Sequence, residues 1–282
     1  MAFGKKKATS SGPVVNQDNV FILASQALAK QRSTRLRLAV LVTITSPGLM
    51  HRWGQKAVLQ MVGNMVGHKI PKTDKDLTAE YEESWYRNVD EQPVVPCRVI
   101  RESIIAGGGP NCGDVVSKAQ LGRELRVLGQ TAPLVFPKGQ GLTMDIQMAR
   151  TSTGTPQPTA RALVPAGTTF KVVLEFPPTL TPDQVMAAAQ SAGDVIGLFD
   201  WRPSKGGEYG RFIVEPLPSS AAQVKAIIEA CSLPEKQFQI PPEMLRAFNA
   251  IPKENLGDPA RKARAVVNHV NGQRAKADEA TS

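Results

Sequence analysis

The sequence predicts an α+β domain built around an antiparallel sheet, and three observations lead to this prediction. Residues 36–44, 142–148 and 169–176 each alternate apolar with mixed side chains, as strands with one buried face do. Residues 182–192 instead repeat their apolar side chains with the period of a helix. The composition is 41% hydrophobic, which supplies a packed core and excludes wholesale disorder.

The first strand and the helix at 182–192 have the clearest local signals. Residues 36–44 put five aliphatic side chains on one face, while Arg35 and Arg37 lie at one end of the other face. A Thr-Pro-Asp sequence opens the helix, because Thr caps a helix, Pro suits its first position and Asp favours the positive end of its dipole. We expect Gly193 to end this helix.

The other elements are predicted from shorter patterns. A last strand is expected at 211–215 and a brief one at 134–136. A short helix is expected within the basic, irregular stretch at 119–128. Helical periodicity predicts further helices at residues 19–30, 52–66, 77–86, 97–106 and 221–231.

Apart from insertions, the order is strand, helix, two strands, helix and strand, with 142–148 as the second strand. This is the βαββαβ order of the ferredoxin-like fold, which is also that of the RNA-recognition motif (RRM-type). Helices would cover one face of the sheet. We expect the open face to carry Arg37, Thr143, Asp145, Gln147, Lys171 and Arg211. It lacks exposed aromatic residues on which bases stack, so nucleic-acid binding would have to involve the loops.

The chain divides into three parts on composition. Residues 1–17 form a flexible basic arm, residues 18–232 one ferredoxin-like domain, and residues 233–282 a helical tail that docks or stays flexible. Insertions in the domain are expected at 52–140 and 150–168. The second is rich in Thr, Pro and Gly and too long for a tight turn, so it predicts a protruding loop or thumb-like hairpin that carries Arg150 and Arg161.

Charge favours a polyanionic partner. The net charge is +9, and binding to phosphates releases their condensed counterions. Residues 1–35 contain six Lys or Arg and one Asp, and the arm includes Lys5, Lys6 and Lys7. Residues 73–91 are acidic, with seven Asp or Glu against two Lys or Arg. The basic arm therefore has two alternatives, a nucleic-acid strand or the acidic segment of another copy.

Several classes of function are excluded. The three cysteines and three histidines have neither the pairing of a disulfide framework nor the spacing of metal ligands. The Gly-rich stretch at 107–113 lacks the Gly-Lys-Ser/Thr that a nucleotide-binding loop needs. The longest apolar run is too short to span a membrane, and no signal peptide opens the chain. We expect no cofactor, no metal and a cytoplasmic location.

The most distinctive segment is the Gly-rich loop at residues 193–212. Its glycines let the backbone approach a phosphodiester, Trp201 and Tyr209 offer faces on which bases stack, and three cations offer phosphate contacts. Those cations are Arg202, Lys205 and Arg211. The structural alternative is a well-ordered connection with Trp201 packed beneath it. The region is nearly neutral, so the attraction for a strand must come from elsewhere.

Three stretches, at 43–52, 95–100 and 196–212, resemble a group of uncharacterised phage proteins. A Gly-rich loop between the second helix and the last strand also resembles the RAMP superfamily of CRISPR-associated proteins. This resemblance implies a backbone-type subunit that polymerises along a strand, with the 150–168 excursion as its thumb. A phage member could coat single-stranded DNA or RNA instead of CRISPR RNA.

The sequence therefore predicts a non-enzymatic protein that binds single-stranded nucleic acid and oligomerises along it, in a bacterial or phage-infected cell. The residues expected to contact the strand are Arg37, His51, Arg52, Arg150, Arg161, Trp201, Arg202, Lys205, Tyr209 and Arg211, assisted by Lys5, Lys6 and Lys7. Two alternatives stay open. One is a RAMP-type endoribonuclease that uses His51 as a general acid or base, and the other is a purely structural assembly protein.

Overall fold

The computed structural model describes residues 35–52, 54, 57, 59–60, 76–150, 156–237, 242 and 246, and of residues 149 and 150 it describes the backbone alone. The basic arm with Lys5, Lys6 and Lys7, the helix expected at 19–30 and nearly all of the tail lie outside the described residues. The same holds for most of the helix expected at 52–66.

The core is a four-stranded antiparallel sheet in the order β4-β8-β1-β9. Its strands are β4 (Arg126–Leu128), β8 (Thr169–Phe176), β1 (Leu36–Ile44) and β9 (Phe212–Pro216). β1 lies in the middle and pairs with both β8 and β9. Its predicted apolar face is inward, with Val40, Val42 and Ile44 almost fully buried.

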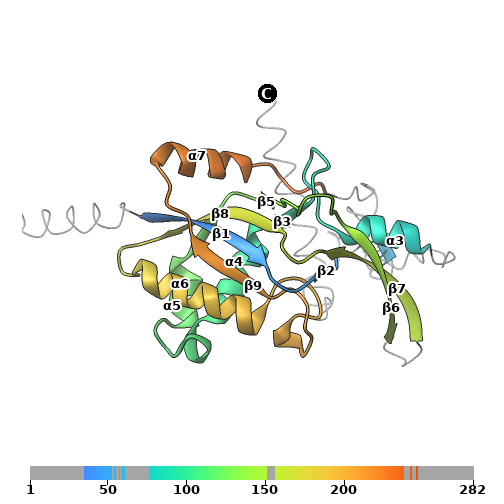
Figure 1. Ribbon diagram of the computed structural model, residues 1–282, viewed down its shortest axis with the longest axis horizontal. Helices are drawn as coiled ribbons and strands as arrows, with labels where there is room; N and C mark the ends of the chain where they lie inside the picture. The colour runs from blue at the N-terminus through green and yellow to red at the C-terminus, as the bar shows by residue number, and fades with distance from the viewer. Residues whose placement is uncertain are drawn as a thin grey trace, which may run out of the picture.

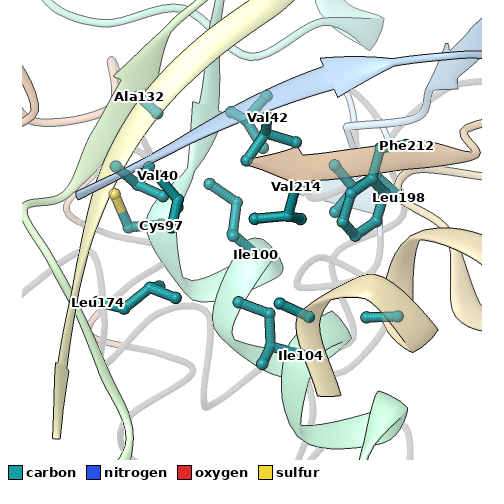
Figure 2. Close-up of a cluster of buried hydrophobic side chains, with 14 of the residues drawn as sticks. Val40, Val42, Cys97, Ile100, Ile104, Ala132, Leu174, Leu198, Phe212 and Val214 are labelled. Carbon is teal, nitrogen blue, oxygen red and sulfur yellow. The ribbon is translucent and has the colours of Figure 1, made fainter. Parts of the chain in front are cut away.

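Three helices lie together on one side of this sheet, as Figure 1 shows. They are α4 (Cys97–Gly107), α5 (Lys118–Glu124) and α6 (Pro182–Ser191). Figure 2 shows Ile100 and Ile104 of α4 lying among the inward side chains of the sheet. The predicted opening of α6 is confirmed, since Thr181 and Gln184 form a reciprocal capping box and Pro182 occupies the first turn.

Gly193 was expected to end this helix, but the helical path of the chain continues through it. α6 passes directly into a π-helical turn, η2 (Ala192–Ile196). A Cβ on Gly193 would lie 1.8 Å from the carbonyl oxygen of Phe212 in β9. Glycine is therefore required here because the helix end and the strand touch, and not because the helix stops.

A second sheet stands beside the core, and it corrects the predicted strand order. It has the order β2-β7-β6, from β2 (Gly48–Met50), β7 (Pro156–Val164) and β6 (Thr143–Arg150). The segment predicted as the second core strand thus pairs with β7 as a long hairpin. β4 occupies the position beside β8 instead. Three residues are too few to show periodicity, so no strand could be predicted there.

The insertion expected at 150–168 is not a loop throughout, because β7 fills most of it and pairs with β6 as a hairpin. Pro156 and Pro158 weaken the strand pattern there. Helix α3 (Leu77–Ser84) packs on β7 and buries Ala160 and Ala162. The β6–β7 hairpin projects away from the core at one end of the molecule (Figure 1).

Smaller elements complete the core. β3 (Val94–Pro96) pairs with β5 (Thr131–Pro133), and the strand expected at 134–136 is reduced to a single bridge from Val135 to Thr169. Short 3-10 turns occur at η1 (Gly109–Cys112) and η3 (Pro203–Lys205). Among the described residues, no helix combines the length and apolar character needed to cross a bilayer, and no group of side chains is arranged to hold a metal ion.

The outer face of the core sheet is partly covered, contrary to expectation. Helix α7 (Ala221–Ala230) lies over it, on the opposite side from α5 and α6 (Figure 1). Ala39 and Val173, which point outward, are 3% and 0% exposed. Arg37 and Lys171 do lie on this face, but Thr143, Asp145 and Gln147 belong to the hairpin, and Arg211 precedes β9.

Candidate nucleic-acid interface

The Gly-rich loop is attached to the second sheet as well as to the core. Asp200 forms an antiparallel bridge with Leu49 of β2, and its N–H donates to the Leu49 carbonyl at 2.9 Å. Gly210 N–H donates to the Pro47 carbonyl at 2.8 Å. The loop thereby lies against the base of the hairpin, and residues distant in sequence meet there. We call His51, Gln147, Arg161, Asp200, Trp201 and Tyr209 the loop–hairpin site.

Trp201 and Tyr209 form an aromatic pair at this site. Their ring centroids are 6.5 Å apart, with the planes tilted by 45°. Tyr209 N–H donates to the Trp201 carbonyl at 3.2 Å, which holds the two residues side by side across the loop. Gln147 Nε2 donates to the Tyr209 hydroxyl at 3.2 Å, so the hairpin orients the tyrosine. Trp201 is 51% exposed, and the alternative in which it packs beneath the loop is wrong.

The backbone holds the loop's aromatics in an unfavourable conformation. Phe199 and Trp201 have φ values of +66° and +49°, a region that bulky residues rarely adopt. Each such residue costs about 1–3 kcal/mol, and strain of this kind gathers at functional sites. The Phe199 side chain is buried, against the backbone of Gly48. Phe199 therefore anchors the loop while Trp201, two residues later, is displayed to solvent.

The loop's glycines have a different role from the one expected. A Cβ on Gly207 would lie 1.8 Å from the Trp201 carbonyl oxygen, and one on Gly210 would lie 2.0 Å from that of Leu198. Both contacts are with the loop's own backbone. Gly206, by contrast, has a φ of +77° and open space around it. At Gly207 and Gly210, glycine permits the loop to fold tightly on itself and needs no approaching phosphodiester to explain it.

A histidine, a carboxylate and an arginine meet at the base of the hairpin. His51 Nδ1 lies 3.4 Å from Asp200 Oδ2, and Arg161 Nη1 pairs with the same oxygen. Burial and the positive charge of Arg161 lower the pKa of His51 from its usual 6.5, although Asp200 opposes the change. His51 is therefore neutral at pH 7. The Nε of Arg161 is buried and has no hydrogen-bond partner in the part of the chain that the structure describes.

The loop's cations are largely occupied by internal contacts. Arg202 donates from Nη1 to the Phe199 carbonyl at 2.9 Å and from Nε to the Ser204 hydroxyl at 3.0 Å. Arg211 Nη1 lies 2.9 Å from Asp194 Oδ1. Lys205 is exposed. The loop thus offers more aromatic surface than uncompensated charge.

Arg37 lies away from the loop–hairpin site, and the side chain of Arg52, the residue after His51, pairs with Glu235 at the start of the tail. Arg52 is 8% exposed, and its Nε lies 3.0 Å from Glu235 Oε1. This buried pair ties the chain after β2 to the start of the tail, so Arg52 has a structural role. Arg37 lies near the start of β1, beside Glu175. Arg150 ends β6, and its side chain is outside the described set.

His51, Arg161, Trp201 and Tyr209 were all predicted from the sequence as contact residues, and the structure brings these four together. Asp200 and Gln147 were not predicted as site residues. Both were visible: Asp200 is in the distinctive loop, and Gln147 is one of the polar positions alternating with Met144, Ile146 and Met148. Only the hairpin pairing shows that this polar side meets the loop.

No family model matches the chain, and no curated protein matches it significantly. Solved structures to which the chain is similar include type III-B Cmr-beta bound to cognate target RNA, at 12% identity and a TM-score of 0.39, covering 73% of this chain and 69% of that one. Cmr6 from Pyrococcus furiosus is 10% identical with a TM-score of 0.34, covering 64% and 98%. Csc2 from Thermofilum pendens is 13% identical with a TM-score of 0.31, covering 82% and 80%.

These three neighbours are RAMP-type CRISPR complex subunits. At such low identities and TM-scores, the likeness does not fix a ligand for this chain.

Proposed function

We propose that this chain binds single-stranded nucleic acid, DNA or RNA, at the loop–hairpin site without cleaving it, and that copies associate along the strand. The observation that carries the proposal is Trp201, half-exposed on a strained backbone beside Tyr209. Backbone strain of this kind gathers at functional sites, and bases stack on exposed aromatic side chains in a sequence-tolerant way.

The site also suits a strand rather than a small ligand. The aromatic pair lies at the junction of two sheets, and the projecting hairpin borders it on one side. Gln147 and the exposed Lys205 are polar groups of the hairpin and the loop that a nucleic-acid backbone could meet. We regard the domain as a ferredoxin-like fold, which the antiparallel order β4-β8-β1-β9 and the alternation of helices and strands support. A phage-type protein acting in a bacterial or phage-infected cell is consistent with the sequence resemblance.

The direct test is binding of labelled oligo(dT) and oligo(U) to the full chain, measured by anisotropy over a salt series. We expect binding to both, with an affinity that falls as salt rises because phosphates release counterions. The proposal is refuted if the chain binds neither probe at low salt. Purified oligomers that contain no nucleic acid, with no binding, would favour a purely structural assembly protein.

Cleavage is the second candidate, and the His51–Asp200 contact favours it. A neutral histidine whose Nδ1 faces a carboxylate leaves Nε2 free to accept a proton. Incubation of wild type and His51→Ala with structured RNA separates the two functions. RNA left intact by both supports binding alone, whereas cleavage by wild type only would establish the endoribonuclease.

A further inference from the structure

A cluster of arginines surrounds one buried carboxylate at the far end of β1 from the loop–hairpin site. Glu175 of β8 is directly opposite Arg37 of β1 in the pairing register and directly opposite Arg126 of β4 on its other side. Opposed residues of antiparallel strands share a face, so all three lie in a row on the outer face. Arg35 joins them from the residue before β1. We call these four residues the Glu175 cluster.

One arginine, Arg37, hydrogen-bonds the carboxylate, Arg35 forms an ion pair with it, and Arg126 lies farther away. Arg35 Nε lies 3.1 Å from Glu175 Oε1, and Arg37 Nε lies 3.2 Å from Oε2. Arg126 Nη1 is 3.8 Å from Oε1, beyond hydrogen-bond distance. Three guanidinium groups against one carboxylate leave two positive charges in excess. The Arg37 and Arg126 side chains are 55% and 65% exposed, while that of Glu175 is 9% exposed.

An open cavity of about 610 Å³ adjoins the cluster, between α7 and the sheet. Its lining includes Arg37 and Lys225, the apolar side chains of Leu128, Val224 and Ile228, and no acidic residue. This size lies within the range of about 300–1,000 Å³ for ligand sites. Cations beside an apolar wall suit a ligand that combines a phosphate with a planar base, which is the unit of a nucleic-acid strand.

We infer that the Glu175 cluster is a second phosphate-binding site for the strand, and this inference rests on the proposed function. Glu175 holds the guanidinium groups of Arg35 and Arg37 in place, and the exposed donors of Arg37 and Arg126 receive a phosphate. β1 has nine residues, so its ends are separated by about 26 Å at about 3.3 Å per residue. A short oligonucleotide at the loop–hairpin site cannot reach the cluster, whereas a long one can.

The test compares two probe lengths on the full chain, oligo(dT) of about 4 and about 16 nucleotides, which bracket common site sizes. The double variant Arg37→Ala/Arg126→Ala should weaken binding of the long probe about tenfold or more and leave the short probe unchanged. Its slope of log affinity against log salt should fall by about 1.4, at about 0.7 per phosphate contact. Arg123→Ala, which removes an exposed arginine from α5 on the opposite side of the sheet, is the matched control.

Glu175→Gln should change the affinity for the long probe in the opposite direction to the double variant. It removes the negative charge at nearly constant shape, so long-probe affinity should rise several-fold in protein that circular dichroism shows to be folded. The inference is overturned if the double variant behaves like Arg123→Ala on the long probe while wild type binds both probes, which leaves the proposed function standing. A change in oligomeric state without a change in probe binding would overturn it in favour of an acidic protein surface. Wild type that binds neither probe overturns both.

Discussion

The loop–hairpin site and the Glu175 cluster lie at opposite ends of β1 and differ in what they offer a ligand. The first has two aromatic rings, with Arg202 and Arg211 already engaged by internal partners. The second has exposed arginines in excess of its single carboxylate and no aromatic residue among its members. Stacking and charge are thus separated in space. A basic chain can therefore present a nearly neutral loop and still attract a polyanion.

The first test concerns Arg52, which was expected to contact nucleic acid but belongs to neither the loop–hairpin site nor the Glu175 cluster. Removing one partner of a buried ion pair costs about 3–5 kcal/mol, so Arg52→Ala should lower the free energy of unfolding by about that amount. Urea denaturation measures it. Arg98→Ala is the matched control, since Arg98 is 56% exposed and 3.7 Å from the same carboxylate of Glu235. It should cost under about 1 kcal/mol.

The binding affinity of folded Arg52→Ala should equal that of wild type. If Arg52→Ala lowered the affinity for the oligonucleotide and left the free energy of unfolding unchanged, Arg52 would be a nucleic-acid contact after all.

Trp201→Ala should weaken oligonucleotide binding by about 1–3 kcal/mol, the value of one stacked base. Because no charge is lost, the slope of log affinity against log salt should stay as in wild type. This behaviour is the reverse of that expected for the Arg37/Arg126 variant. Anisotropy titrations at several salt concentrations measure both quantities. Trp201→Phe is the control and should keep most of the affinity. A salt slope reduced by Trp201→Ala would contradict the proposed separation of stacking at the loop–hairpin site from charge at the Glu175 cluster.

His51 gives the smallest expected effect, a pH dependence of stability. Burial lowers its pKa in the folded state, so between that pKa and about 6.5 the unfolded chain binds more protons. The stability that depends on neutral His51 is present above about pH 6.5 and is lost as the pH falls through the folded pKa. The Tm of wild type should therefore fall more steeply than that of His51→Gln from pH 7 to 5. Parallel curves would show that His51 is not perturbed.

The sequence predicts the local elements well and the pairing between them poorly. β1, α4 and α6 have strong periodicity or caps, and all three are found where expected. The alternation at 142–148 does mark a strand, but alternation says nothing about which strand it meets. Its apolar residues Met144, Ile146 and Met148 are 40%, 54% and 61% exposed, because they belong to the hairpin and not to the core.

The candidate sites show the same difference between local patterns, which can be predicted, and contacts between distant segments, which cannot. Trp201 and Tyr209 were identifiable because aromatic residues among glycines are unusual in one short stretch. The Glu175 cluster was not, because Arg126 and Glu175 meet only through the register of β4 on β8. Of the cluster's members, only Arg37 was predicted from the sequence as a contact residue. Contacts made by distant segments need the three-dimensional fold, however clear each segment is.

The measurement that tests the central claim most directly is the fluorescence of Trp201 on strand binding. The chain has three tryptophans, and replacing Trp53 and Trp85 by Phe leaves Trp201 as the only strong emitter. Stacking of a base on the indole should quench this emission as oligo(dT) is added, in step with the rise in anisotropy of the labelled probe. Emission that stays constant while the probe binds would show that the strand lies elsewhere and would contradict the account.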